Sequence, residues 1–259
     1  MERVVKMIGW KRTIHTMATA ALLASAMPSY AQEEPADPAA AKKDPPGWVK
    51  SASLGFTLTD GNSDTVLFTA KAEASRKWDE NEFASGAGVT YGEDDGEKNN
   101  EAVYAFGQYN RLFSDRFYGL VRLAFLHDAI ADVEYRISLS PGLGYYFIKE
   151  ENTTFSGEAG PSFIYEKQGS EETGYFAARL AERFDHKFSD RARVWQFAEF
   201  LPQVDDLDNW ILNAEVGGEA ALTEKVKLQI YIQDSYDNEP APGRTENDLK
   251  VVSALAMTF

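Results

Sequence analysis

The chain has 259 residues, with 26 basic residues, 41 acidic residues, no cysteine and a formal net charge of −15. The absence of cysteine excludes disulfide bonds and thiol chemistry. The excess of acid argues against nucleic acid as a partner. Packing or a membrane must therefore stabilise the fold.

The N-terminal residues have the layout of an export signal. Four basic residues within 1–12 precede an apolar, alanine-rich stretch over residues 14 to about 27, and Ser29 and Ala31 are the small residues of a signal-peptidase site. The stretch is shorter than the roughly 20 residues of a spanning helix, and Pro28 interrupts it. We therefore expect residues 1–31 to be a signal peptide.

The next segment, residues 32–46, is acidic and rich in Ala and Pro, which predicts a flexible linker. From residue 47 onward apolar and polar residues alternate with period two, as in Val226–Gln233, and this pattern indicates strands. No later stretch is apolar for about 18 residues, so a membrane location requires a β-barrel. The predicted strands are about twelve in number, at 48–59, 65–78, 82–92, 100–112, 117–127, 133–148, 153–167, 173–187, 192–203, 209–222, 226–236 and 247–259.

The predicted connections alternate between two kinds. Tight turns are expected near 79–81, 113–116, 149–152, 188–191 and 223–225, and longer polar connections near 60–64, 93–99, 128–132, 168–172, 204–208 and 237–246. This asymmetry, with an even number of strands and aromatic residues near the strand ends, is typical of bacterial outer-membrane barrels. Most of the excess acid falls in the longer connections, and Asp94, Asp95, Asp205 and Asp206 are the candidates for an acidic rim.

The last strand presents apolar residues on one face and ends in Phe259. Such an end resembles the terminal signature that the outer-membrane assembly machinery reads. We therefore expect that machinery, together with outer-membrane lipid and lipopolysaccharide, to be partners of the mature chain.

Residues 54–65 (LGFTLTDGNSDT) resemble the opening hairpin of the DUF481 family, whose members are often labelled salt-induced outer-membrane proteins. The second strand, rich in Ala, Lys and Glu over 69–75, and the terminal Phe259 fit the same family. The resemblance covers about residues 48–259. It implies a barrel in the outer membrane and, through the family label, a link to salt or envelope stress, and it brings no catalytic residues.

A search for chemistry gives little. His127 and His186 are expected at opposite ends of the barrel, so they cannot share a site, and no serine nucleophile accompanies His127 and Asp128. The acidic runs match no calcium-loop spacing. We expect neither an enzyme nor a cofactor or metal site.

The inward faces of the predicted strands carry charges of both signs, which must be paired or hydrated. The candidate lumen residues are Lys71, Glu73, Arg122, Glu134, Arg136, Glu158, Arg179, Arg183, Glu215 and Glu219. Such residues either interlock as a salt-bridged plug or line a narrow aqueous pore, and about twelve strands is a size between a filled barrel and an open channel.

The sequence thus predicts an all-β, antiparallel, up-and-down transmembrane barrel of about twelve strands over residues 47–259. The function that fits is a structural role or a narrow pore for small solutes that prefers cations. A surface-binding or adhesion barrel is the alternative, and an outer-membrane hydrolase is a remote one. The sequence leaves the oligomeric state open.

Overall fold

The computed structural model describes residues 47–58 and 65–259. The predicted signal peptide, the predicted linker and the loop that contains Gly61 and Asn62 lie outside the described residues. Among the described residues, no helix is long and apolar enough to cross a membrane.

The described chain forms twelve β-strands. They are β1 (Val49–Leu58), β2 (Thr65–Trp78), β3 (Asn81–Asp94), β4 (Glu97–Leu112), β5 (Phe117–Asp128), β6 (Val133–Lys149), β7 (Thr153–Gln168), β8 (Glu171–Ser189), β9 (Ala192–Pro202), β10 (Trp210–Ala221), β11 (Val226–Asp237) and β12 (Asn247–Thr258). Each of them corresponds to one predicted strand, and the ends differ by no more than three residues. Alternation of side chains therefore located every strand.

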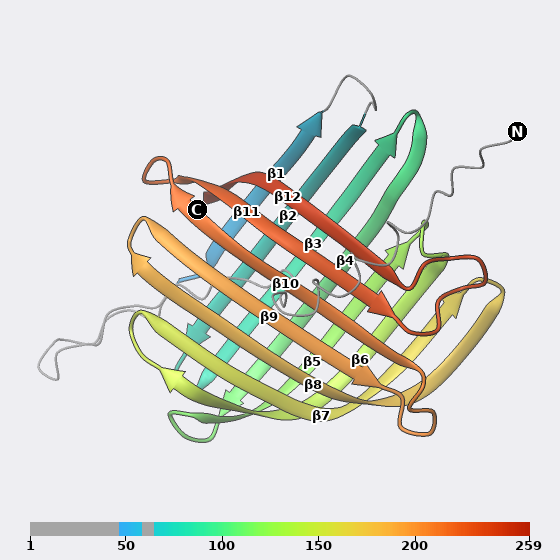
Figure 1. Cartoon of the computed structure of the whole chain (residues 1–259). Helices are drawn as coiled ribbons and strands as arrows, with labels where there is room; N and C mark the ends of the chain where they lie inside the picture. The colour runs from blue at the N-terminus through green and yellow to red at the C-terminus, as the bar shows by residue number, and fades with distance from the viewer. Residues whose placement is uncertain (1–46, 59–64) are drawn as a thin grey trace, which may run out of the picture.

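The strands close into one barrel in which each strand pairs antiparallel with its neighbours in the chain (Figure 1). The barrel closes where β1 pairs with β12, over five residue pairs from Ser51–Thr258 to Gly55–Ala254. The prediction of an antiparallel, up-and-down barrel of twelve strands is confirmed.

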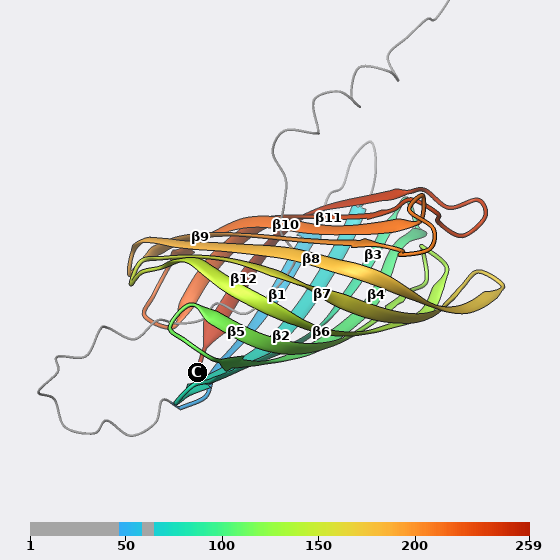
Figure 2. The same cartoon turned by 90° about the horizontal axis from the view of Figure 1, so that it is seen from below.

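We call the end of the barrel with the β1–β2, β3–β4, β5–β6, β7–β8, β9–β10 and β11–β12 connections the loop end, and the opposite end the turn end. In Figure 1 the loop end lies to the right and the turn end to the left. Figures 1 and 2 together show a flattened barrel, in which β8–β11 face β1–β4 across the interior. A flattened cross-section brings side chains of opposite walls within contact distance.

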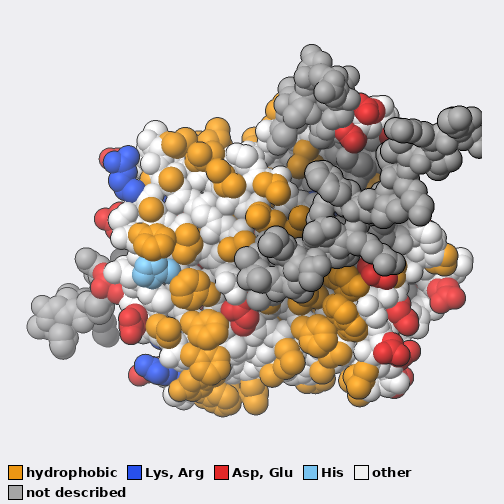
Figure 3. Space-filling view, in the orientation of Figure 1, with side chains coloured by type: hydrophobic (Ala, Val, Ile, Leu, Met, Phe, Trp, Pro, Cys, Tyr) orange, Lys and Arg blue, Asp and Glu red, His pale blue; other side chains and the backbone are white. Residues whose placement is uncertain are grey.

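Alternate residues of each strand face outward and inward, because successive side chains of a strand point to opposite faces. The outward set is mainly apolar and exposed, as in Leu54, Leu123, Phe176 and Leu255, and Figure 3 shows such side chains over much of the visible outer surface. The inward set contains most of the buried polar and charged residues, including Arg179 and Glu215. This is the distribution of a barrel with an apolar exterior and a polar interior.

Two predicted long connections are wrong. The structure joins β3 to β4 through Asp95 and Gly96 alone, and β7 to β8 through Gly169 and Ser170 alone. Asp95 and Gly96 have φ values of 49° and 78°, the conformation of a two-residue hairpin turn. An Asp-Gly pair between two strands strongly favours such a turn. The sequence prediction missed it because the polar residues on both sides of the pair suggested a longer loop.

The candidate functional site in the lumen

Nine of the ten predicted lumen residues lie on inward faces: Lys71 and Glu73 on β2, Arg122 on β5, Arg136 on β6, Glu158 on β7, Arg179 and Arg183 on β8, and Glu215 and Glu219 on β10. Glu134 is the exception. Its side chain is 61% exposed and forms an ion pair with Lys167. The pairing of β6 with β7 shifts between Val133 and Tyr135, so the alternation that predicted an inward Glu134 is interrupted there.

The first group of buried charges is centred on Glu215, whose residue is 1% exposed. Lys71 Nζ lies 3.2 Å from Glu215 Oε2, and Gln233 donates a hydrogen bond of 2.9 Å to the same oxygen. Trp195 donates its indole N–H to Oε1. Lys71 Nζ also lies 3.9 Å from the centroid of the Tyr231 ring. Side chains of β2, β9 and β11 therefore surround this carboxylate of β10 and its counter-ion.

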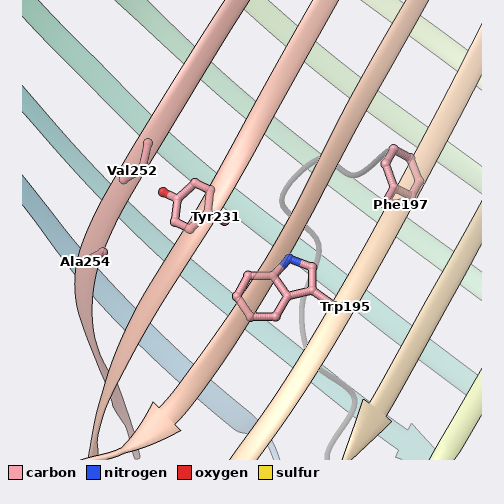
Figure 4. Close-up of a cluster of buried hydrophobic side chains, with 5 residues drawn as sticks. All are labelled: Trp195, Phe197, Tyr231, Val252 and Ala254. Carbon is pink, nitrogen blue, oxygen red and sulfur yellow. The ribbon is translucent and has the colours of Figure 1, made fainter. Parts of the chain in front are cut away.

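Aromatic side chains fill the interior next to this group. Trp195, Phe197, Tyr231, Val252 and Ala254 form a buried cluster on β9, β11 and β12 (Figure 4). On β10, between β9 and β11, a Cβ atom at Gly217 would lie 2.3 Å from the ring of Trp195. Only glycine therefore lets the indole lie across β10 and reach Glu215.

The second group is centred on Arg179, which is 2% exposed. Its Nε and Nη1 atoms lie 2.6 Å from Glu199 and 2.8 Å from Glu158. Arg122 Nε lies 3.8 Å from the same oxygen of Glu199. Gln108 donates a hydrogen bond of 2.8 Å to Glu158. This series of contacts joins β4 and β5 on one side to β7, β8 and β9 on the other.

The third group lies toward the loop end and is centred on Arg136. Arg136 pairs with Glu166 on the adjacent strand β7, and its Nη2 atom lies 2.7 Å from Asp237 on β11. Tyr175 donates a hydrogen bond of 2.9 Å to Glu166, and Gln168 one of 3.3 Å to Asp237. The Arg136–Asp237 pair joins strands that are five positions apart in the closed sheet.

Two further groups lie toward the turn end. Glu82 accepts hydrogen bonds from Tyr146 and Asn110, at 2.8 and 3.3 Å, and pairs with Lys77. Glu219 lies beside Lys227 at 2.5 Å and beside Arg193 at 3.6 Å. Of the remaining predicted residues, Glu73 accepts a hydrogen bond from Ser51 and Arg183 lies over the Phe197 ring.

These groups act as cross-links inside the barrel. An isolated charge in a low-dielectric interior costs several kcal/mol, and opposite charges with full hydrogen bonding reduce that cost. Three of the links, Lys71–Glu215, Arg122–Glu199 and Arg136–Asp237, join strands that are not neighbours in the sheet. Paired side chains therefore span the lumen at several positions.

A cavity of about 210 Å³ lies in the loop half of the lumen, and its lining includes residues of the second and third groups. Its charged lining residues have both signs: Arg122, Asp128, Arg136, Glu199, Asp234, Asp248 and Lys250. Its apolar lining includes Phe106, Ile164 and Leu201. The cavity therefore combines charged groups of both signs with an apolar wall.

The predicted acidic rim residues all lie at the loop end. Asp94 and Asp95 are at the β3–β4 hairpin, and Asp205 and Asp206 are in the connection between β9 and β10, on a different side of the barrel. Gln203 donates a hydrogen bond to Asp205 at 2.9 Å. Figure 3 shows carboxylates at the loop end, and both acidic and basic side chains at the turn end.

The remaining candidates are separate from the lumen. Phe259 is 71% exposed at the turn end, and its backbone N–H donates a hydrogen bond of 2.9 Å to the carbonyl of Lys50. His127 Nδ1 lies 2.8 Å from the carbonyl oxygen of Glu134 near the loop end, and His186 lies near the turn end. In the part of the chain that the structure describes, no group of three or more His, Asp or Glu residues could hold a metal ion.

Sequence reasoning missed several members of the lumen groups, above all Arg193 and Glu199 on β9. On this strand Trp195 and Phe197 share the inward face with these charges, while the outward face carries Gln196 and Phe200. Both faces of β9 therefore mix apolar and polar residues, so the alternation with period two did not show which face points into the lumen. The link from Arg136 to Asp237 was missed because alternation predicts a face but no partner across the lumen.

Solved structures with a similar fold include two porins and an autotransporter translocator domain. The NanC porin superposes with a TM-score of 0.50 at 8% identity, over 82% of this chain and 98% of that chain. The KdgM porin in complex with disordered oligogalacturonate gives a TM-score of 0.46 at 9% identity, over 81% and 99% of the two chains. The translocator domain of the autotransporter NalP from Neisseria meningitidis gives 0.45 at 12% identity, over 82% and 87%.

A likeness at such low identity shows the fold alone, and among curated proteins nothing matches this chain. The family with the description "Protein of unknown function, DUF481" matches residues 52–259, which is the whole barrel apart from the first residues of β1. The chain therefore belongs to the DUF481 family.

Proposed function

We propose that this protein is an outer-membrane barrel whose lumen is a narrow, charge-lined path for small ions, closed to larger solutes by side chains. The closed barrel fits a lipid environment for two reasons. Its outer surface is mainly apolar, and each strand has a hydrogen-bonded neighbour on both sides. In this setting the turn end, with the terminal Phe259, faces the periplasm and the acidic loop end faces outward.

The observation that carries the proposal is the set of ion pairs between walls. Lys71–Glu215, Arg122–Glu199 and Arg136–Asp237 span the interior between strands that are not neighbours, and Arg179 is held between two carboxylates. Water and small ions can move past paired charges, whereas a sugar-sized solute requires these pairs to separate. The cavity of about 210 Å³ in the loop half, which is lined partly by charged groups, supports an entrance for ions at that end.

An adhesion role is less well supported. The β3–β4 and β7–β8 connections have only two residues each, so the loop end offers a small surface to a partner. A catalytic role is less well supported too, since the two described histidines lie at opposite ends of the barrel and cannot act on one substrate. We therefore propose permeation of small ions without catalysis.

The test is single-channel conductance in planar bilayers, for the wild type and for a variant in which Arg122, Glu158, Arg179 and Glu199 are all Ala. This variant removes two cations and two anions, so the net charge does not change. We expect low conductance in the wild type and a several-fold increase in the variant. The matched control changes the exposed ion pair between Arg111 and Glu80, which lie 2.6 Å apart, to Gln at both positions.

Equal conductance in wild type and quadruple variant would contradict the proposal, because the second group would then not limit the path. Absence of conductance in both would show that the lumen is a plug. A control that conducts like the quadruple variant would show that the change arises outside the lumen.

A further inference from the structure

The pairing of β6 with β7 is interrupted in the middle of both strands. It stops at Leu139 and resumes at Leu143, and the register on both sides of this gap places Pro141 opposite Pro161. Proline has no N–H group, so neither residue can donate a ladder hydrogen bond to the other. Both strands have neighbours on each side, where proline is rare, and this indicates that the interruption has a structural role.

Two glycines on the inner face let the backbones of β6 and β7 approach closely at this point. A Cβ atom at Gly160 would lie 2.2 Å from the carbonyl oxygen of Pro141 and 2.6 Å from the Cα atom of Gly142. A Cβ atom at Gly142 would lie 2.8 Å from the carbonyl oxygen of Ala159. These neighbours are backbone atoms, which cannot rotate away as a side chain can. An alanine at either position would therefore push the two strands apart.

The close approach lies where the sheet turns from one wall of the barrel to the other. β1–β4 and β8–β11 form the facing walls, and β5, β6 and β7 connect them along one side of the flattened barrel (Figures 1 and 2). We call this connection the corner. Side chains crowd on the concave inner face of a curved sheet, and glycines at defined positions permit such curvature. The contact between Gly142 and Gly160 therefore allows the corner to bend and the walls to meet.

The second group of buried charges lies beside the corner. Arg122 on β5 is the sheet partner of Ser140, and Arg179 on β8 is the sheet partner of Gly160. Ser140 lies next to Ser162, with their hydroxyl oxygens 2.8 Å apart. Serine and glycine thus form the inner face of the sheet between the two arginines. Their small size leaves the space over β6 and β7 to the longer side chains of the second group.

The ion pair between Arg122 and Glu199 depends on this space, because it joins β5 to β9 over the three strands between them. Its length of 3.8 Å exceeds the 2.6 and 2.8 Å of the pairs that Arg179 forms with Glu199 and Glu158. A small separation of the walls is therefore enough to break it. We infer that the contact between Gly142 and Gly160 is the positioning element that sets the width of the lumen at the second group. The glycines act through the curvature of the sheet and not by contact with a solute.

The experiment measures the distance between the walls by pulsed electron paramagnetic resonance on the protein in detergent micelles. The chain has no cysteine, so V103C/L180C places one nitroxide label on the outer face of β4 and one on that of β8. The distance is compared between the labelled parent, G160A and G142A. The matched control is G218A, where a Cβ atom would lie 3.7 Å from its nearest neighbour, an ordinary contact. Heat-dependent gel mobility shows whether each variant is folded.

We expect the mean distance between the labels to increase by a few ångström in G160A and G142A and to stay at the parent value in G218A. In planar bilayers the same two variants should conduct several-fold more than the wild type. The conductance arm rests on the proposed function, whereas the distance arm does not. A longer distance without any conductance would support the inference and contradict the pore.

Three results would overturn the inference. The first is the parent distance in folded G160A and G142A, which would mean that the corner does not set the width. The second is an equal increase in G218A, which would mean that any added methyl group in the sheet moves the walls. The third is loss of the folded barrel in both glycine variants with G218A folded, because the glycines would then be required for closure of the barrel and not for its width.

Discussion

Lys71 on β2 and Glu215 on β10 form an ion pair of 3.2 Å across the lumen, although β1, β12 and β11 separate their strands in the closed sheet. Both side chains are nearly inaccessible to solvent, at 11% and 2% exposure. The pair links two walls of the flattened barrel through side chains alone. Removing this ion pair should therefore change both the free energy of unfolding and the conductance of the barrel.

We predict that K71M destabilises the barrel by about 3–5 kcal/mol, because it leaves the buried charge of Glu215 without its counter-ion. The double variant K71M/E215Q should be closer to the wild type, since it removes both charges. Urea unfolding in detergent, followed by tryptophan fluorescence, measures the free energy of unfolding. A loss below about 1 kcal/mol for K71M would show that water already compensates Glu215.

Glycine under an aromatic ring offers a second prediction. A Cβ atom at Gly217 would lie 2.3 Å from Trp195, whereas a Cβ atom at Gly107 on the outer surface would meet nothing within 4 Å. G217A should destabilise the barrel by about 1–3 kcal/mol through overpacking. G107A is the matched control and should be neutral or slightly stabilising, because Ala restricts the unfolded chain. Equal midpoints of urea unfolding for the two variants would contradict the described packing.

Glu182 is a carboxylate on the mainly apolar outer surface. Glu182 on β8 accepts a hydrogen bond of 2.9 Å from Gln196 and lines a groove of about 540 Å³ beside Leu180 and Phe200. Charged residues that face lipid destabilise transmembrane barrels. E182L should therefore stabilise the barrel in lipid vesicles by about 1 kcal/mol, whereas E224Q in a turn should have no effect. A destabilised E182L would mean that the carboxylate has a partner in the membrane.

The sequence predicted the strands because their outward and inward faces meet different surroundings over ten or more residues. Nine of the ten lumen charges that it predicted face inward for the same reason, and the prediction failed at Glu134, where a shift in pairing breaks the alternation. Contacts across the lumen, such as Arg136 with Asp237, could not be predicted. They depend on the flattening of the barrel and on the stagger of the strands, which no local pattern contains.

The terminal residue gives a prediction about assembly. Phe259 donates its backbone N–H to Lys50 on β1 and exposes its ring on the outer surface next to the seam. F259D should lower the amount of folded barrel in the membrane, because it removes an apolar anchor from the closing strand. Heat-dependent gel mobility of membrane fractions measures the folded amount, and T258S is the control. Wild-type amounts of folded F259D would show that Phe259 is not part of an assembly signal.

The acidic loop end gives the last prediction, which rests on the proposed pore. Carboxylates at a mouth raise the local concentration of cations, so reversal potentials across a salt gradient should show cation preference. Changing Asp94, Asp95, Asp205 and Asp206 to Asn should reduce that preference. The effect should fade from 0.1 M to 1 M salt, where the Debye length falls from about 10 Å to about 3 Å. The control changes four acids at the turn end to their amides, Glu80, Asp115, Glu150 and Asp190, and should shift the potential less, because basic residues offset them there. Anion preference in the wild type, or equal shifts in both variants, would place selectivity at the buried lumen pairs instead.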